Sequence, residues 1–350
     1  MKGPESDRPV LVSGDRPTGR LHLGHWVGTL ENRVRLQESC RSFYIVADLH
    51  FLTTHGDRAM EVRDNAREIV LDWLAAGLDP ERSTFVLQSQ VPEIAELSVI
   101  LSMLCPVPRA QRIPSLKEMR DALGLEENYS LGLLSYPVLM AADVLLFKAR
   151  KVPVGEDQLA HLELARELAR RFNRIYGFDF DEPEAVVSTV PRLVGTDGAR
   201  KMSKSLGNAI LLADDPDTVE RRVRGMYTDP NRVRSDVPGT VEGNPVFTYH
   251  DLFNSDRAEV EDLKARYRAG KVGDVEVKEK LARALNRFLL PFHERRKVWE
   301  TRAAEAWDLL VAGTRKARGI AAEHLEGVLE SMGMPSFRAL RGGMAPPSAA

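Results

Sequence analysis

The sequence predicts an α/β fold in which a parallel-sheet domain precedes an α-helical domain. Two observations predict the sheet: short apolar runs of strand length recur through the first 200 residues, and segments with helical periodicity separate them. Strands that alternate with helices are typical of parallel sheets with crossover helices. A third observation predicts the helical domain, because strand signals fade after Asn208 and apolar residues then recur at helical spacing.

The expected elements of the first 90 residues alternate between strand and helix. An apolar run at 10–12 stops at Ser13-Gly14, which predicts a buried strand. A loop containing proline and glycine follows, and a helix begins near Leu23 and continues to about residue 37. The next expected elements are a strand at 43–47, a helix at 64–76 and a strand at 84–87.

The rest of the chain is expected to be largely helical. Residues 93–150 contain mainly helices, and Pro137 suits the first turn of one of them. Pro291 should kink or break a later helix. Further expected elements are a strand at 152–154, a helix at 158–172 and a strand at 190–194. The predicted division is a sheet domain at 1–208 with a helical insertion at about 93–150, a helical domain at 209–341 and a disordered tail at 342–350.

Composition indicates a soluble globular protein. The 350 residues include 49 basic and 51 acidic side chains, and this balance neither indicates nor excludes a local basic face. Only Cys40 and Cys105 occur, which excludes a disulfide framework, and no Cys/His cluster indicates a metal site. No apolar stretch has the length of a membrane span, and the N-terminal residues lack the apolar core of a signal peptide. We therefore expect a cytoplasmic protein.

The first candidate site is the HLGH motif, His22-Leu23-Gly24-His25, which lies where the first strand gives way to a helix. A helix N-terminus offers unpaired N–H groups and favours anions. Gly24 would let the backbone approach a ligand, and two imidazoles three residues apart can donate to phosphate oxygens. The alternatives are two surface histidines beside a helix start, or a metal site that lacks a nearby third ligand.

The second candidate site is the KMSKS motif, Lys201-Met202-Ser203-Lys204-Ser205, which follows a glycine-rich loop. Two ammonium groups on such a loop can clamp a triphosphate and neutralise departing pyrophosphate, and the serine hydroxyls add donors. The alternative is a solvated basic loop. Neither G-x-x-x-x-G-K-[ST] nor G-x-G-x-x-G occurs, so phosphate binding requires a different device.

Two further segments combine polar and apolar side chains at meaningful spacing. Tyr136, Met140, Asp143 and Phe147 share one helical face, where a lone carboxylate is costly to bury without a partner. A ligand N–H would satisfy Asp143; alternatively, the carboxylate pairs elsewhere in the protein. In the second segment, at 152–158, a strand ends at a glycine and a helix follows. That turn fits either a ribose-binding site or a helix capped by its aspartate at 157.

Together these motifs resemble the signatures of class I aminoacyl-tRNA synthetases, and the segments at 136–147 and 152–158 resemble tryptophanyl-tRNA synthetases in particular. The resemblance extends from about residue 10 to about residue 340. It implies a Rossmann-like nucleotide-binding domain and a helical domain that recognises the tRNA anticodon. It also implies a homodimer that uses ATP with Mg²⁺ to form tryptophanyl-adenylate from L-tryptophan and then acylates tRNA(Trp).

The resemblance assigns two sets of site residues. His22, His25, Lys201 and Lys204 would be catalytic. The remaining ATP-binding positions would be Arg16, Pro17, Thr18, Gly24, Gly155, Glu156, Asp157, Leu193, Met202, Ser203 and Ser205. The resemblance also implies that Asp143 accepts the indole N–H and that Tyr136 and Gln158 hold the ammonium group. The wall of the tryptophan pocket would be formed by Val12, Ala47, His50, Met140, Val152 and Val154.

Several positions depart from the commonest pattern of the family. Many members have Thr-Ile-Gly-Asn where this chain has the HLGH motif, and Gln-Pro-Ser-Gly where it has Arg-Pro-Thr-Gly at 16–19. Val12 replaces a usual aromatic residue and Ala47 replaces a usual valine. Because both lie near the expected indole pocket, we expect that pocket to be roomier and to tolerate ring-substituted tryptophans.

Three alternative functions remain open from the sequence. A tyrosine-specific synthetase shares the fold and both motifs, although the segments at 136–147 and 152–158 favour tryptophan. A non-charging paralogue with a regulatory or partner-binding role would retain the fold. A small adenylate-forming ligase would act on another carboxylate. Basic residues of the C-terminal half form either an RNA-binding face or solvated helix faces: Arg221, Arg222, Arg224, Arg232, Arg234, Arg295, Arg296 and Lys297, with Tyr227.

Overall fold

The computed structural model describes residues 8–125, 128–188, 190, 193–229, 232, 234 and 236–335. The tail predicted at 342–350 lies outside the described residues. Five strands form one parallel sheet in the order β3-β2-β1-β4-β5, which confirms the predicted parallel arrangement. The strands are β1 (Val10–Asp15), β2 (Arg41–Val46), β3 (Ser83–Leu87), β4 (Lys151–Val154) and β5 (Glu184–Val187).

The strand order places a ligand crevice beside β1. Successive strands β1, β2 and β3 extend the sheet in one direction, whereas β4 and β5 lie on the other side of β1. Parallel α/β sheets bind ligands beyond the carboxyl ends of the strands at such a reversal. The segments that follow β1 and β4 are the HLGH loop and the turn at 155–158, so both candidate segments lie at this edge.

The strand predicted at 190–194 is wrong. The fifth strand is β5 (Glu184–Val187), and of the predicted segment Val194 forms only an isolated bridge with Lys201. Residues 191 and 192 lie outside the described residues. β5 is a short edge strand without fully buried residues, and its apolar run, Ala-Val-Val, was passed over in favour of the segment at 190–194.

Helices and single turns of 3₁₀ or π helix connect and follow the strands. The first part contains α1 (Leu23–His25), η2 (Trp26–Leu30), α2 (Glu31–Leu36), α3 (Asp48–Leu52), η3 (Gly56–Glu61), α4 (Val62–Ala76), η4 (Gln88–Gln90), α5 (Pro92–Ser102), α6 (Val107–Gln111), α7 (Pro114–Leu123), α8 (Leu131–Leu145), η5 (Glu156–Gln158) and α9 (Leu159–Tyr176). The second part contains α10 (Pro216–Arg224), α11 (Pro245–Phe253), α12 (Arg257–Arg268), α13 (Asp274–Thr301) and α14 (Ala303–Ser331).

The two prolines flagged in the sequence lie inside helices. Pro137 is an interior residue of α8, because Ser130 caps the helix by accepting the N–H of Leu133 over 3.1 Å and the helix therefore begins at Leu131. Pro291 likewise lies within α13, which runs through it without a break. An interior proline costs about 3 kcal/mol, and packing of α8 against α5 and α9 offsets that cost.

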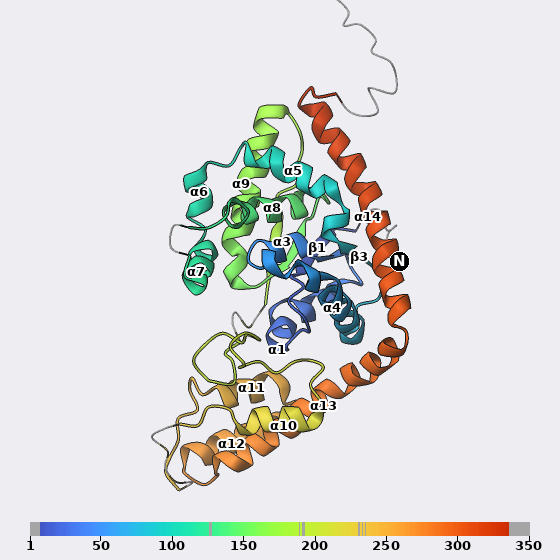
Figure 1. Cartoon of the computed structure of the whole chain (residues 1–350). Coiled ribbons are helices and arrows are strands. Elements are labelled where there is room, and N and C mark those ends of the chain that lie inside the picture. Colours follow the sequence, from blue (N-terminus) through green and yellow to red (C-terminus); the bar gives the residue numbers. More distant parts are fainter. Residues whose placement is uncertain are drawn as a thin grey trace, which may run out of the picture.

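The last two helices connect the helical region to the sheet. Figure 1 shows α10–α12 gathered below the sheet, α13 rising from them, and α14 running along one side of the molecule. α13 packs against α10, α11 and α4, whereas α14 packs against β3, α4 and α5. Thr314 of α14 accepts the N–H of Leu87 over 2.9 Å, which gives the β3 edge a hydrogen-bond partner. The division at residue 208 stays a prediction, and α14 belongs to the packing of the sheet.

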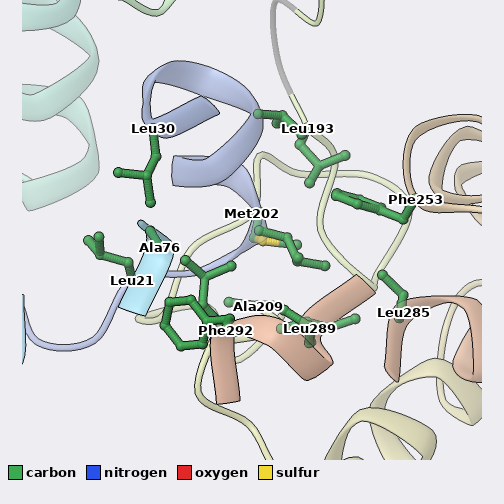
Figure 2. Close-up of a cluster of buried hydrophobic side chains, with 14 of the residues drawn as sticks. Leu21, Leu30, Ala76, Leu193, Met202, Ala209, Phe253, Leu285, Leu289 and Phe292 are labelled. Carbon is green, nitrogen blue, oxygen red and sulfur yellow. The ribbon is translucent and has the colours of Figure 1, made fainter. Parts of the chain in front are cut away.

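One hydrophobic core extends from the sheet into the helical region, and residues of both motif segments lie in it. Figure 2 shows Met202 of the KMSKS motif among Leu21, Leu30, Leu289 and Phe292. The helical spacing of apolar residues expected after Asn208 is confirmed in α13, where Leu281, Leu285, Leu289 and Phe292 form the face that packs into this core. The core thereby fixes the KMSKS segment against the start of the HLGH segment.

Candidate active site

The HLGH motif presents two neutral imidazoles of defined tautomer. His22 accepts the N–H of Gly24 through Nδ1 over 3.1 Å, and His25 accepts the N–H of His22 through Nδ1, also over 3.1 Å. Burial, together with the nearby positive charges, lowers the pKa of His22 far below its usual value and lowers the pKa of His25 to about 4. Each ring therefore carries its proton on Nε2 near neutral pH and can donate a hydrogen bond there.

Gly24 has a different role from the predicted one. A Cβ at this position would lie 2.9 Å from both Cε1 and Nδ1 of His22 and 3.6 Å from Cβ of Met202. The space above Gly24 is thus filled by the motif's own imidazole rather than left for a ligand. Glycine is required because it lets the His22 ring fold back onto the helix start.

The HLGH and KMSKS motifs lie in contact with each other. The backbone N–H of Gly24 donates to Sδ of Met202 over 3.3 Å. Lys204 Nζ donates to the carbonyl of Arg20 over 2.7 Å, and burial lowers the pKa of Lys204 to about 8. Residues 210–212 pair with 21–23 through the backbone, which aligns the two chain segments. Together these contacts place the ammonium group of Lys204 close to the segment that carries the imidazoles of His22 and His25.

Asn208 closes the loop that carries the second motif. Its side chain accepts the N–H of Ser203 over 2.7 Å and donates to the Asp197 carboxylate over 2.9 Å and to the carbonyl of Lys201 over 3.3 Å. The Ser203 and Ser205 hydroxyls lie 3.0 Å apart. Leu193 is buried and accepts the N–H of Met202 over 3.0 Å. The sequence analysis missed Asn208, whose polar side chain just after the motif was the available signal.

The turn after β4 also contacts the KMSKS motif. Lys201 Nζ lies 3.0 Å from Oδ2 of Asp157, and although burial raises the pKa of this carboxyl, Lys201 lowers it below its usual value. The predicted capping role of Asp157 is wrong, because α9 has no side-chain cap and begins after a 3₁₀ turn. Gly155 is partly buried and Glu156 is exposed. This turn therefore lies against the KMSKS motif through the ion pair between Asp157 and Lys201.

The loop before the HLGH motif is anchored by an arginine. Arg16 Nη2 donates to Oγ1 of Thr54 over 2.5 Å and lies 3.5 Å from Nδ1 of His55. Its Nε is buried and has no hydrogen-bond partner within the described residues. Pro17 is buried, whereas Thr18 is exposed and its N–H turns back to the carbonyl of Arg16 over 2.7 Å. Arg16 thus ties this loop to the segment at 54–55.

The carboxylate of Asp143, on α8, is buried in a second group of polar side chains. His50 Nε2 lies 2.9 Å from Oδ2 of Asp143, and Gln88 Nε2 lies 2.8 and 2.9 Å from its two oxygens. The alternative in which Asp143 pairs within the protein therefore holds. Gln88 was missed, although its position directly after β3 was a signal; its Oε1 accepts the N–H of Leu49 over 3.1 Å, which turns the amide N–H₂ toward Asp143.

Tyr136 belongs to a hydrogen-bonded cluster that the sequence did not reveal. Its Oη lies 2.6 Å from Oγ of Ser115 and 2.7 Å from Nε2 of His161. Burial raises the pKa of Tyr136 to about 12 and lowers the pKa of His161 to about 4. Gln158 contacts Asp157 over 3.2 Å instead of this cluster. The predicted apolar wall is brought into one hydrophobic cluster: Val12, Ala47, Val152 and Val154, with Met140 packed against it.

The described residues offer neither a cluster of metal ligands nor a membrane-spanning helix. Within the described ranges, no group of three or more His, Cys, Asp or Glu side chains could hold a metal ion. No helix of the described chain is long and apolar enough to cross a membrane. Two members of the expected RNA face, Arg232 and Arg296, are 6% and 4% exposed and pair with Asp274 and Asp72, so they do not contribute to such a surface.

Comparison with known proteins identifies the class to which this site belongs. The model of the family described as tRNA synthetases class I (W and Y) matches residues 5–290. The chain belongs to this family, and its fold is Rossmann-like with a following helical region.

Within the family, the similarity is to the tryptophan-specific members. A tryptophan--tRNA ligase from Treponema pallidum is 55% identical over 326 residues, which cover 93% of this chain and 96% of the relative. The structure of tryptophanyl-tRNA synthetase from Campylobacter jejuni complexed with ADP and tryptophan is 33% identical, with a TM-score of 0.79, and the match covers 93% of this chain and 100% of that one. The resemblance to tryptophanyl-tRNA synthetases is therefore confirmed.

The tyrosine-specific alternative is less favoured. A tyrosyl-tRNA synthetase from Archaeoglobus fulgidus, solved with L-tyrosine, is 25% identical with a TM-score of 0.66, and the match covers 83% of this chain and 91% of that one. Both the identity and the structural similarity are lower than for the tryptophanyl-tRNA synthetase from Campylobacter jejuni.

Proposed function

We propose that this protein activates L-tryptophan with ATP and transfers the tryptophanyl group to tRNA(Trp). The observation that carries the proposal is the meeting of the HLGH motif, the KMSKS motif and the turn after β4 beside a separate pocket that contains Asp143. The first assembly fits a nucleoside triphosphate, and the second fits an aromatic side chain with an N–H donor. The reaction belongs in the cytoplasm, where tRNA is charged.

In the activation step, the tryptophan carboxylate attacks the α-phosphate in line and pyrophosphate leaves. The neutral imidazoles of His22 and His25 donate from Nε2 to phosphate oxygens, and Lys201 and Lys204 neutralise the leaving group. No side chain needs to act as a nucleophile, because positioning and charge stabilisation lower the barrier. Mg²⁺ would be carried by the triphosphate and add charge neutralisation there, beside the Ser203 and Ser205 hydroxyls.

Asp143 supplies selectivity for tryptophan. Its carboxylate oxygens offer about four acceptor sites, so they can accept an indole N–H in addition to the hydrogen bonds from His50 and Gln88. Phenylalanine has no donor, and tyrosine presents an O–H at the tip of a single ring instead of an N–H on a fused ring, so neither reproduces the indole hydrogen bond. A site of this kind can reject the wrong amino acid by about 10⁴–10⁵-fold. Tyr136 and Gln158 would hold the ammonium group.

ATP–pyrophosphate exchange with the purified protein and each of the twenty amino acids tests this proposal. Exchange driven by tryptophan alone is expected. Exchange driven by tyrosine would overturn the role of Asp143. Absence of exchange with every amino acid would support the non-charging paralogue, and exchange with another carboxylate would support a different adenylate-forming ligase.

The tryptophan pocket is expected to accept tryptophans substituted at ring position 4 or 5. Val12 and Ala47 are small side chains in the apolar cluster around Tyr136 and Asp143. Val12→Phe should abolish exchange with the substituted analogues while retaining exchange with tryptophan, because the added ring fills the extra volume. Val10→Phe, on the same strand at a partly buried position, is the control. Equal rejection of all analogues by the unchanged protein and by Val12→Phe would contradict the prediction.

We also propose that the protein is a homodimer. Val99 and Met103, one turn apart at the end of α5, and Val107 at the start of α6 are 57%, 74% and 56% exposed. Apolar side chains that gather in this way mark an interaction surface. Met103→Glu should therefore give a monomer in light scattering, whereas Met60→Glu, at a solitary apolar residue that is 92% exposed, should not. An unchanged mass for Met103→Glu would exclude this surface as the interface.

A further inference from the structure

Arg296 of α13 is buried against α4. Its side chain is 4% exposed, and its guanidinium donates to three carboxylates. Nη1 donates to Asp72, Nη2 donates to Glu68 over 2.6 Å, and Nε donates to Glu300 over 3.0 Å. Two of these acceptors, Asp72 and Glu68, lie on α4, so the guanidinium ties α13 to α4.

Asp72 joins this ion pair to the backbone just before the HLGH motif. Its side chain is fully buried, and the oxygen that Arg296 does not use accepts the N–H of Leu21 over 2.6 Å. The carbonyl of Leu21 accepts the N–H of Leu212 over 2.9 Å. Both the N–H and the carbonyl of Leu21 are therefore hydrogen-bonded, and Leu21 directly precedes His22 in the chain.

Glu68 makes a second connection to the same loop. Its Oε2 accepts from Arg296 and from Nε of Arg20, the latter over 2.7 Å. The carbonyl of Arg20 in turn accepts from Nζ of Lys204 over 2.7 Å. Residues 20 and 21 thus contact the α13–α4 ion pairs through a side chain and an N–H. The carbonyl of Arg20 contacts the KMSKS motif, and the carbonyl of Leu21 contacts Leu212.

We propose that Arg296 and Asp72 are positioning residues for ATP: they fix the backbone of Arg20 and Leu21 so that the imidazoles of His22 and His25 and the ammonium of Lys204 converge on the phosphates. The inference rests on the proposed function, in which these three side chains bind ATP. It goes beyond that function because neither Arg296 nor Asp72 is expected to touch the substrate.

The chemistry of the pair fits positioning better than stabilisation alone. A buried ion pair adds little net stability over apolar packing, because desolvation opposes the attraction. Here Asp72 and Glu68 each accept both from Arg296 and from the loop before the HLGH motif, so the charge orients a backbone segment. Burial raises the pKa of Asp72 to about 6 even with Arg296 opposing the shift. Without Arg296 the carboxyl would take up a proton and hold the Leu21 N–H less firmly.

Steady-state ATP–pyrophosphate exchange with tryptophan tests the inference. Arg296→Met should raise the KM for ATP by about tenfold or more and leave the KM for tryptophan within about twofold, a loss of about 1.4 kcal/mol in ATP binding. Arg296→Lys should recover part of the loss, because one ammonium can reach Asp72 but cannot bridge to Glu68 and Glu300. Asp72→Asn, which keeps the volume and an acceptor oxygen, should also raise the KM for ATP selectively.

The matched control is Lys264→Met. Lys264 pairs with Asp251 and Glu261 over 2.7 and 2.9 Å in the helical region, and within the described ranges it forms no hydrogen bond or ion pair with residues 20–25. Every variant is assayed well below its own melting temperature. The inference is overturned if Arg296→Met and Asp72→Asn melt earlier but keep the wild-type KM for ATP, or if the KM values for ATP and tryptophan rise together. If the unchanged protein shows no exchange at all, the proposed function fails first.

Discussion

Lys204→Ala should lower kcat of tryptophan-dependent ATP–pyrophosphate exchange by about 10²–10³-fold, the range found when one preorganised donor to developing charge is removed. The ammonium of Lys204 already lies beside the HLGH segment through its hydrogen bond to the carbonyl of Arg20, so it needs little reorganisation to meet the leaving pyrophosphate. The KM for tryptophan should change little, because Asp143 and Tyr136 belong to a separate cluster.

The pH dependence gives this prediction a second readout. Burial lowers the pKa of Lys204 from 10.5 to about 8, so the charged form is lost as the pH rises through about 8. Since kcat/KM for ATP reports the free enzyme, it should fall above pH 8 in the unchanged protein. Lys204→Arg keeps the charge to a much higher pH and should remove this alkaline limb. A full alkaline limb in Lys204→Arg, or an unchanged kcat in Lys204→Ala, would contradict the role assigned to Lys204.

Asp143→Ala should lower kcat/KM for tryptophan by about 10–100-fold, as expected for the loss of a hydrogen bond to a charged group, about 1.5–3 kcal/mol. The effect should appear as a higher KM for tryptophan and a smaller preference over phenylalanine and tyrosine, because the hydrogen bond from the indole N–H no longer favours tryptophan. The KM for ATP should stay close to its original value.

The control for Asp143 must separate the carboxylate from its neighbours. Asp143→Ala also removes the acceptor for His50 and Gln88, and their buried donors then lack a partner. Gln88→Leu removes one donor to Asp143 and keeps the carboxylate, so it should weaken tryptophan binding less than Asp143→Ala and retain discrimination. Equal losses in both variants, or a parallel rise in the KM for ATP, would assign Asp143 a structural role only.

Much of the fold followed from local patterns. The apolar runs predicted β1–β4 within a few residues, because β1, β2 and β4 are inner strands and the edge strand β3 is covered by α14. The same rule missed β5, a four-residue edge strand without fully buried residues. The prediction that Pro137 lies in the first turn of a helix is wrong, because the cap at Ser130 and the packing of α8 outweigh the preference of proline for a first turn.

The sequence by itself determined the class of chemistry, since the HLGH and KMSKS motifs and the 136–158 segment carry side chains whose types and spacing fit only a few tasks. Tertiary structure alone decided the partners of those side chains. Gln88 contacts Asp143, and Ser115 and His161 contact Tyr136, from elements that are distant in the chain. Arg296, predicted to lie on an RNA face, is buried against α4. The physical reason is that periodicity reports which face of an element is buried, whereas a hydrogen bond or an ion pair depends on the neighbour that packing brings to that face.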